Sequence, residues 1–318
     1  MKLASHLTLL KNFSLRSSLI DKNRKFTVKW VNFEFSSGCN LRCKWCSLDH
    51  SKPWEFMSPE ILAKVLDELS KSKEFDLERI DLHNAGEILL HKNLEEMLRV
   101  IANRKVYFKN TTIATLTNAT LLTPDVSRIL IDSCALDEIQ FSVDGGTKQL
   151  YEDIRGGAKW EQVQANITSF IELNNNSTST MNRTRVICII PAERDKSTEW
   201  MEDDFKKLFS KIDVVELRYA HNWDGSASLG VEFNEQTRKH FEEIDKTKCL
   251  FLDRNLVVLP NGNVTLCCAD LNSRGIIGNV NDHTMEQLYF SKKRIETIKL
   301  FKKGDKHKIE LCKHCTGY

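Results

Sequence analysis

Apolar and polar positions follow two alternating patterns from about residue 30 onward. Short apolar runs, typical of buried strands, are each followed by a stretch with apolar residues at every third or fourth position, the spacing of a helix face. The first helix is expected after Ser58-Pro59, with serine as the N-cap and proline as the first helical residue. Strands that alternate with helices in this way predict parallel βα units.

Six strands fit this pattern. We expect them over residues 31–35, 79–83, 112–116, 138–143, 186–190 and 214–219, with helices beginning at residues 59, 94, 124 and 160. A polar stretch over 174–183 is expected to be an exposed loop. Because ligands of parallel α/β folds bind at the carboxyl ends of the strands, the loops after the first, second and fourth strands should form one functional rim.

The two ends of the chain depart from this repeat. Residues 1–28 form a polar and basic N-terminal extension, in which 7–15 suits a short amphipathic helix. The βα repeat is expected over 29–225, a linker over 226–248 and a small domain over 249–318. In that domain two short strands around a glycine turn predict a hairpin over 259–266, followed by a helix over 284–288.

Composition narrows the class of protein. A chain of 318 residues with 41% hydrophobic residues can bury one large core and a smaller satellite. Its 46 lysines and arginines and 44 acidic residues are spread along the chain, which disfavours a nucleic-acid partner. No apolar run approaches the roughly 20 residues that span a bilayer. The ten cysteines group in ligand spacings and no signal peptide is evident, so we expect a cytoplasmic protein without membrane contact.

Cys39, Cys43 and Cys46, which we call the cysteine triad, follow the first predicted strand in the spacing CxxxCxxC. Thiolates are the protein ligands of iron–sulfur clusters, and three of them leave one iron of a [4Fe-4S] cluster open for a non-protein ligand. A structural zinc site is the competing interpretation, but it requires four ligands. His50 is near in sequence and is poorly spaced to be the fourth.

The segment Cys39-Asn-Leu-Arg-Cys43-Lys-Trp45-Cys46 resembles the signature of the radical S-adenosylmethionine (radical SAM) superfamily, CxxxCxΦC with an aromatic residue before the last cysteine. The resemblance implies a partial (β/α)6 TIM-like barrel. It also implies that the open iron binds SAM, and that an electron from the cluster cleaves SAM to methionine and a 5'-deoxyadenosyl radical, which takes a hydrogen atom from the substrate. A flavodoxin or ferredoxin would supply the electron.

The same resemblance extends to the loop after the second predicted strand. Ala85-Gly86-Glu87 is similar to the "GGE" turn of the superfamily, with alanine in place of the first glycine. Glycine allows the backbone to approach the ligand, and the Glu87 carboxylate would accept from the ammonium group of SAM.

Other rim positions match further SAM contacts of the superfamily. Ser142 and Asp144 resemble the positions that contact the ribose, Arg155 the arginine that pairs with the SAM carboxylate, and Trp45 would lie near the adenine. Each residue also has a plain structural interpretation: a strand-end turn for Ser142 and Asp144, a solvated charge for Arg155, and loop packing for Trp45.

The tail carries a second set of cysteines. Its order of strand, turn, strand, Cys-Cys, helix and terminal CxxC resembles the SPASM/twitch extension of radical SAM proteins, which holds an auxiliary [4Fe-4S] cluster. Four thiolates would fill all four irons and leave none for substrate, which points to electron transfer. A zinc site is the alternative. The expected ligands are Cys249, Cys267, Cys312 and Cys315.

Three cysteines remain outside these sets. Cys268 would line the pocket, donate a hydrogen atom or serve as a spare ligand. Cys134, at a helix end, and Cys188, within an apolar strand, are expected to be ordinary buried thiols.

In size and tail layout the chain is similar to one-auxiliary-cluster enzymes of the 2-deoxy-scyllo-inosamine dehydrogenase type. That resemblance implies a radical SAM oxidoreductase acting on a carbohydrate or cyclitol-type small molecule: a C–H bond breaks, a proton leaves the adjacent hydroxyl, and the electron passes to the auxiliary cluster. The candidate bases are Asp270, Asp224 and His221. The alternatives are a redox-neutral epimerase with Cys268 or Cys249 as hydrogen donor, a maturase that modifies a peptide substrate, and a non-catalytic iron–sulfur or zinc protein.

Overall fold

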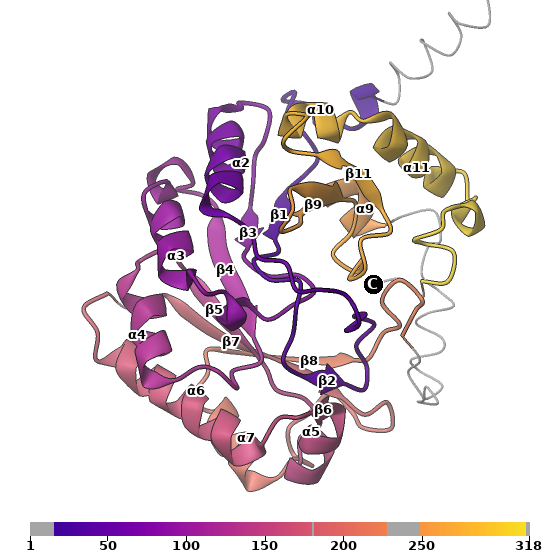
Figure 1. Cartoon of the computed structure of the whole chain (residues 1–318). Helices are drawn as coiled ribbons and strands as arrows, with labels where there is room; N and C mark the ends of the chain where they lie inside the picture. Colours follow the sequence, from indigo (N-terminus) through magenta and orange to yellow (C-terminus); the bar gives the residue numbers. More distant parts are fainter. Residues whose placement is uncertain (1–15, 180, 228–248, 316–318) are drawn as a thin grey trace, which may run out of the picture.

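The computed structural model describes residues 16–179, 181–227 and 249–315, and a nine-stranded sheet lies at its centre (Figure 1). Six strands, parallel and adjacent in chain order, correspond to the predicted βα repeat. They are β1 (Trp30–Phe33), β3 (Arg79–Asp81), β4 (Thr112–Thr117), β5 (Glu138–Ser142), β7 (Arg183–Ile190) and β8 (Val214–Tyr219). The predicted helix over 7–15 and nearly all of the predicted linker lie outside the described residues.

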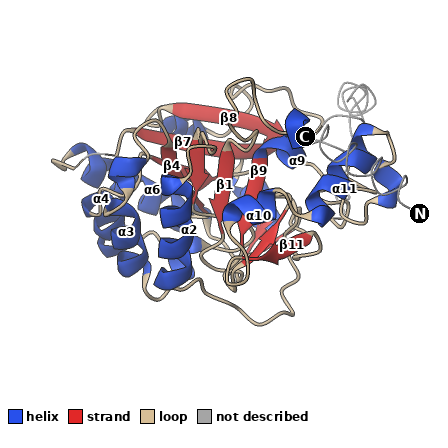
Figure 2. Ribbon diagram, turned by 90° about the horizontal axis from the view of Figure 1, so that it is seen from above, coloured by secondary structure: helices blue, strands red, loops and turns tan. Residues whose placement is uncertain are grey.

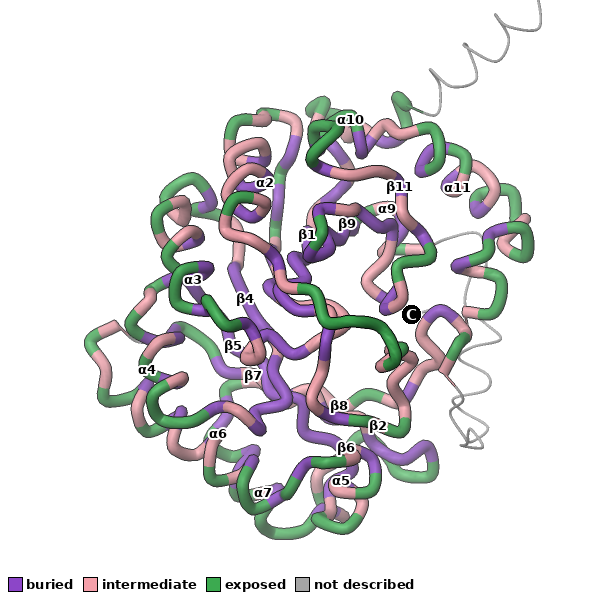
Figure 3. The backbone as a smooth tube through the Cα atoms, in the orientation of Figure 1, coloured by how far each residue is buried: buried purple, intermediate pink, exposed green. Residues whose placement is uncertain are grey.

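Helices form an arc outside these strands, so that the sheet curves as an incomplete barrel (Figure 1). They are α2 (Pro59–Lys71), α3 (Leu94–Ala102), α4 (Pro124–Asp132), α5 (Lys148–Ile154), α6 (Trp160–Asn175) and α7 (Asp203–Phe209). The predicted N-cap of α2 is confirmed, because the Ser58 side chain accepts from the Ile61 amide. The strands between the helices are largely buried, whereas the outer helix faces are exposed (Figure 3). The fold is therefore the predicted parallel α/β class.

The tail extends the main sheet rather than standing apart from it. Strand β9 (Asn255–Val258) pairs parallel with β1, and β10 (Asn263–Thr265) and β11 (Ile276–Asn279) add antiparallel strands beyond it. The hairpin predicted over 259–266 is thus present as β9 and β10, with its first strand four residues earlier. The tail helices are α9 (Leu250–Arg254), α10 (Met285–Tyr289) and α11 (Lys292–Lys302), and Figure 2 shows α11 at the far end from α3 and α4, with α10 between them near α2.

The described part of the predicted N-terminal extension packs on the tail. The Phe26 ring stacks on Tyr289 of α10 with ring centroids 4.2 Å apart, and the Thr27 amide donates to the Tyr289 hydroxyl. Phe26 therefore lies in the hydrophobic core beside the tail, and the domain boundary at residue 28 stays a prediction. No helix in the described ranges is long and apolar enough to cross a membrane.

Two short strands connect the loop of the cysteine triad to the segment that follows α5. Strand β2 (Arg42–Cys43) pairs antiparallel with β6 (Arg155–Gly156), so that Cys43 faces Arg155 in register. Of the two remaining predicted buried thiols, Cys188 is buried on β7, but Cys134 is exposed. The prediction for Cys134 was wrong: the residue lies beyond the end of α4, in the left-handed region with a φ of 54°, and it is exposed. Three short 3-10 helices complete the fold: Ile88–Leu90, Lys105–Tyr107 and Lys306–Lys308.

Candidate active site

A cavity of about 210 Å³, which we call the cysteine cavity, opens at the carboxyl ends of the parallel strands. The cysteine triad and all seven residues predicted to contact SAM line it: Trp45, Ala85, Gly86, Glu87, Ser142, Asp144 and Arg155. The fold thus brings together residues that lie up to 116 positions apart in the numbering, from Cys39 to Arg155. The predicted functional rim exists, and the role of each residue toward SAM stays a prediction.

Nitrogen donors surround the sulfur atoms of the triad. The Leu41 amide lies 3.5 Å from Cys39 Sγ, the Asn118 side-chain amide 3.9 Å from the same sulfur, and Arg155 Nη1 3.7 Å from Cys43 Sγ. Such donors stabilise cluster-ligating thiolates and tune the cluster they hold. Burial raises the pKa of the free Cys39 thiol to about 12, so binding of iron must displace its proton. The donor set therefore fits an iron–sulfur cluster with one open iron.

The turn at Gly86 is held tightly against the start of the cysteine loop. The Glu87 amide donates to the Gly38 carbonyl at 2.8 Å. A Cβ at Gly86 would lie 2.8 Å from the Ser36 carbonyl carbon and nearer still to two carbonyl oxygens, so no other residue fits without backbone movement. Glycine is required here for close approach rather than for an unusual φ.

Glu34 supports this turn from below, and the sequence analysis missed it. Its Oε2 accepts from the Asn84 side-chain amide at 3.0 Å and from the Ala85 amide at 3.1 Å. Burial raises the pKa of Glu34 to about 7. The signal that could have identified it is an acidic residue inside the apolar run of the first strand.

The Glu87 carboxylate is buried and already accepts three hydrogen bonds. Oε1 accepts from the Thr117 hydroxyl at 2.7 Å and the Leu89 amide at 3.1 Å, and Oε2 accepts from the Asn118 amide at 2.8 Å. Burial raises its pKa despite these donors. A carboxylate has about four acceptor positions, so an ammonium group would take the remaining one.

Arg155 is an ion-paired residue rather than a solvated charge. Its Nε lies 2.6 Å from Asp144 Oδ2; Asp144 is buried, and the Arg155 side chain is only 14% exposed. Asp144 Oδ1 accepts from the Ile189 amide at 2.8 Å, which ties the pair to β7. Asp144 and the neighbouring Cys43 keep the pKa of Arg155 above its ordinary value even though burial opposes this. A SAM carboxylate at Arg155 would join this pair.

A second cavity of about 360 Å³, the polar cavity, continues from the first. The two share a set of lining residues: His83, Asn84, Leu116, Ile187, Arg218, His221 and Trp223. The polar cavity is lined by charged side chains in pairs, among them Arg79 with Asp81 at 2.8 Å and Arg218 with Glu216 at 2.7 Å. Because each arginine and carboxylate in its lining has an ionic partner, the wall offers many polar groups but little net charge.

Three polar atoms on residues lining the polar cavity are buried and have no hydrogen-bond partner in the described chain. They are His83 Nδ1, Asn84 Oδ1 and Asn255 Oδ1. Buried polar atoms are nearly always satisfied in native proteins, so such a group indicates a missing ligand or water. Burial lowers the pKa of His83, which keeps its ring neutral at neutral pH. His83 was expected only as the last residue of a strand.

His221 lines both cavities, and the hydrogen bond at its Nδ1 determines which ring nitrogen carries the proton. The Trp223 amide donates to His221 Nδ1 at 3.1 Å, so the proton of the neutral ring sits on Nε2. Burial, aided by Arg218, lowers the pKa of His221 to about 4. In this tautomer the ring donates a hydrogen bond through Nε2 and does not accept a proton there, which disfavours the predicted role of base.

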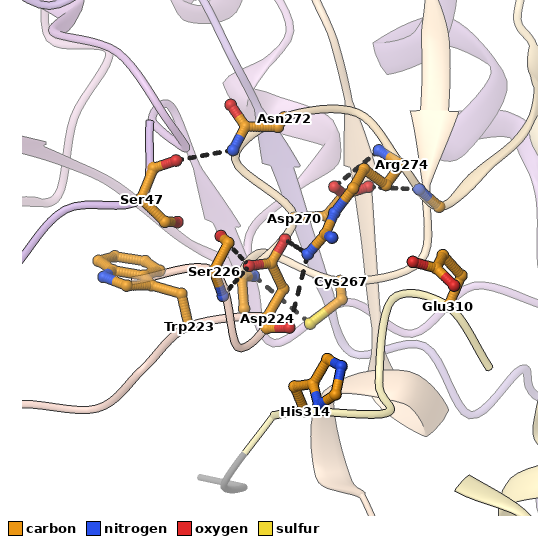
Figure 4. Close-up of polar contacts among 12 residues, drawn as sticks. Ser47, Trp223, Asp224, Ser226, Cys267, Asp270, Asn272, Arg274, Glu310 and His314 are labelled. Atoms are coloured by element: carbon orange, nitrogen blue, oxygen red, sulfur yellow. Dashed lines mark hydrogen bonds and ion pairs between the residues drawn. The ribbon is translucent and has the colours of Figure 1, made fainter. Parts of the chain in front are cut away.

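Asp270 and Asp224 line neither cavity. Asp270 is fully buried and accepts from the Thr265 hydroxyl at 2.5 Å and from the amides of Arg274 and Gly275 at 2.8 and 2.7 Å. Asp224 is buried and ion-paired with Arg274 (Figure 4). Both carboxylates are held by donors in the loops around Cys267, outside the two cavities, and their role as bases stays a prediction.

The tail cysteines Cys249, Cys267, Cys312 and Cys315 face one another closely enough to interact electrostatically. Burial raises the pKa of Cys249 to about 11, and the Ala269 amide lies 3.4 Å from Cys267 Sγ. Within the described ranges no three His, Cys, Asp or Glu side chains converge tightly enough for a single metal ion. Four half-buried thiols could fill the four irons of a cubane cluster. Cys268 instead lines the polar cavity.

Comparison with known proteins agrees with this geometry. Residues 33–203, more than half of the chain, match the radical SAM superfamily, and residues 249–316 match SPASM, an iron–sulfur cluster-binding domain. The tungsten-containing aldehyde ferredoxin oxidoreductase cofactor-modifying protein of Pyrococcus furiosus is 30% identical over 118 residues, 37% of this chain and 31% of that protein. The S-adenosyl-L-methionine-dependent 2-deoxy-scyllo-inosamine dehydrogenase of Niallia circulans is 29% identical over 69 residues, 22% of this chain and 28% of that protein. The matched segments thus span less than a third of either relative.

Solved structures resemble the chain over most of its length. BtrN in complex with AdoMet and 2-DOIA has a TM-score of 0.59 at 19% identity and covers 92% of this chain and 94% of its own. The enzyme anSMEcpe with bound AdoMet has a TM-score of 0.63 at 19% identity, covering 90% and 88%. SuiB of Streptococcus suis bound to the precursor peptide SuiA has a TM-score of 0.66 at 14% identity, covering 98% and 76%. At these identities the likeness is one of fold. The chain belongs to the radical SAM superfamily, which uses SAM on a [4Fe-4S] cluster, and its tail is a SPASM domain for an auxiliary iron–sulfur cluster.

Proposed function

We propose that this radical SAM enzyme oxidises a small, neutral, hydroxyl-rich molecule of carbohydrate or cyclitol type in the polar cavity. The observation that carries the proposal is the set of three buried, unpartnered polar atoms on His83, Asn84 and Asn255. Hydroxyl groups both donate and accept, so a polyol would satisfy them together. The ion-paired wall favours a neutral ligand over an anion, because no arginine that lines it lacks a carboxylate partner. The 2-deoxy-scyllo-inosamine dehydrogenase relative supports the same substrate class.

The cluster on the triad, with SAM, supplies the radical that removes a substrate hydrogen atom. The chain's own residues do the rest: the polar cavity orients the hydroxyl-bearing carbon toward the cysteine cavity, with which it shares His83 and Asn84. His83 then takes the hydroxyl proton at Nδ1, the neutral ring atom with no partner among the described residues. The tail cysteines hold the auxiliary cluster that receives the electron. An external flavodoxin or ferredoxin remains the proposed electron donor, and a cytoplasmic setting the proposed location.

The test uses a panel of cyclitols and monosaccharides deuterated at carbon, incubated anaerobically with the reconstituted enzyme, SAM and reductant. We expect deuterium in 5'-deoxyadenosine and one ketone per SAM consumed. His83→Gln should keep SAM cleavage and slow substrate oxidation by about 10²- to 10⁴-fold, the usual contribution of a general base. His221→Gln is the matched control in the same wall and should have a smaller effect. The absence of deuterium from 5'-deoxyadenosine with every member of the panel, while SAM is still cleaved, would overturn the proposal.

Two other functions have specific support. Cys268 lines the polar cavity, where it could return a hydrogen atom to a substrate radical, as a redox-neutral epimerase requires. In that case Cys268→Ala would stop turnover and the product would carry solvent deuterium at carbon, whereas our proposal expects oxidation to continue. Peptide modification is supported by the fold likeness to SuiB, whose structure contains a bound precursor peptide.

Removal of the auxiliary cluster distinguishes substrate oxidation from a redox-neutral reaction and from a non-catalytic role. The variant with Cys312→Ala and Cys315→Ala should still cleave SAM but lose substrate oxidation, because the electron acceptor is gone. Undiminished product formation in this variant would remove the acceptor role. A chain that bound zinc in the tail would contain about four irons instead of about eight after reconstitution.

A further inference from the structure

The loop 221–226, which follows β8, touches both cysteine sites. On one side the Trp223 indole nitrogen donates to the Trp45 carbonyl at 2.7 Å, next to Cys46 of the triad. On the other side the Asn222 side chain donates to the His314 carbonyl at 2.9 Å, within the terminal CxxC. We call residues 221–226 the bridging loop because it contacts the loops of both predicted clusters.

The bridging loop packs against the terminal CxxC without room for a side chain. Gly225 has a φ of +89°, and a Cβ there would lie 2.7 Å from the carbonyl carbon of His314. Its neighbour Asp224 is buried, with Oδ1 accepting from the Ser226 amide at 3.1 Å. Asp224 Oδ2 has the Arg274 guanidinium as its ionic partner and no other donor in the described residues. The charge of Asp224 is therefore balanced by Arg274.

Arg274 belongs to the turn that follows Cys267, as Figure 4 shows. Its amide donates to Asp270 Oδ1 at 2.8 Å, and the Asp270 amide donates to the Cys267 carbonyl at 3.1 Å. Arg274 also interacts electrostatically with Glu310, two residues before Cys312. Asp224 and Arg274 thus place one negative and one positive charge beside the cysteine ligands of the tail.

We propose that the ion pair between buried Asp224 and the partly exposed Arg274 is a positioning device that keeps the surroundings of the auxiliary cluster electrically balanced and fixes its reduction potential. Cluster potentials depend on net charge and hydrogen bonds around the sulfur atoms. An unbalanced positive charge stabilises the reduced, more negative cluster and raises the potential, whereas an unbalanced negative charge lowers it. The charge of buried Asp224 is weakly screened and that of Arg274 more strongly, so the two halves of the pair should act with opposite sign and Asp224 should have the larger effect. The inference rests on the ligand assignment within the proposed function.

The experiment is a redox titration of the auxiliary cluster followed by EPR spectroscopy in the full chain with both clusters reconstituted. The triad triple-alanine variant identifies which signal belongs to the tail. Asp224→Asn should shift the auxiliary potential upward, Arg274→Gln downward, and the double variant back toward the wild-type value. Asp125→Asn, which removes a carboxylate from an exposed surface pair on α4, is the matched control and should cause no shift.

Shifts of the same sign in both single variants, or a double variant no closer to wild type, would overturn the inference and indicate a loosened loop. If the Asp224→Asn variant loses the iron of its tail cluster, the test compares the auxiliary potentials of Arg274→Lys and Arg274→Gln instead. Both variants alter the side chain, but only Arg274→Gln removes the charge, so only its potential should fall. Equal potentials in those two variants would also overturn it. Failure of the ligand assignment has a different signature: the triad triple-alanine variant would then show no [4Fe-4S] signal at all.

Discussion

Gly86→Ala tests the close approach between the SAM turn and the cysteine loop. The added Cβ would lie 2.8 Å from the Ser36 carbonyl carbon, against 3.4 Å at the onset of ordinary van der Waals contact, and it would be nearer still to the carbonyl oxygens of Ser36 and Gly38. The shortfall is at least 0.6 Å against backbone that cannot rotate away. Overpacking of this kind costs about 1–3 kcal/mol, which corresponds to a loss of roughly 5- to 150-fold in SAM affinity if the turn must move to relieve it.

The assay is equilibrium binding of SAM to the anaerobically reconstituted protein, with 5'-deoxyadenosine formation as a second measurement. Ala85→Gly is the matched control, because it changes the neighbouring residue toward the glycine usual in the superfamily. We expect Ala85→Gly to bind SAM about as well as the wild type. The reasoning would be refuted by a folded Gly86→Ala variant with full iron content that binds SAM within twofold of the wild-type affinity.

Three further predictions follow from contacts at the same rim. Each alanine substitution in the cysteine triad should abolish reductive cleavage of SAM while lowering the iron content from about eight to about four, measured by 5'-deoxyadenosine and iron assays. Arg155→Gln should cost about 3–5 kcal/mol in the free energy of unfolding, measured by denaturant titration, because it leaves buried Asp144 without its cation; adding Asp144→Asn should restore most of the loss. Glu34 binds a proton more tightly in the folded state, with a pKa of about 7 against 4.5, so its stabilising contribution is full below pH 4.5 and is lost as pH rises through 7, by up to about 3 kcal/mol. Glu34→Gln should flatten this pH dependence in unfolding curves taken between pH 4.5 and 7.5, and an unchanged slope would contradict the assignment.

Local patterns in the sequence were sufficient for the parallel core, and the resemblance to the superfamily's motifs supplied the members of the cysteine cavity. Helix caps such as Ser58 act on the nearest turn, and strand ends in a parallel sheet share an edge, so the positions of Gly86 and Asp144 followed from their order in the chain. The helices, strands and shared rim needed only short-range physics and one rule of topology, whereas the choice of SAM-contacting residues on that rim needed the family's motifs.

The remaining features depend on contacts between distant segments. Pairing of β9 with β1 joins residues more than 220 positions apart, which no local periodicity reports. Asp224 and Asp270 look in sequence like polar residues on a rim, and only the fold shows that Arg274 and the amides beside it occupy both carboxylates. His83 was overlooked because it was expected to be the last residue of a strand. In the structure β3 ends at Asp81, and the His83 ring lines the polar cavity.

The pairing of β9 with β1 also has a consequence for how the protein is made. During synthesis β1 leaves the ribosome more than 220 residues before the strand that covers its outer edge. At about 5–20 residues per second this edge stays open for roughly 10–45 seconds, a template for pairing with other chains. The four-residue length of β1 limits that hazard, since short edge strands aggregate less readily. The nascent chain is therefore most vulnerable before its tail cysteines exist, and expression at a low rate of synthesis initiation should favour soluble protein.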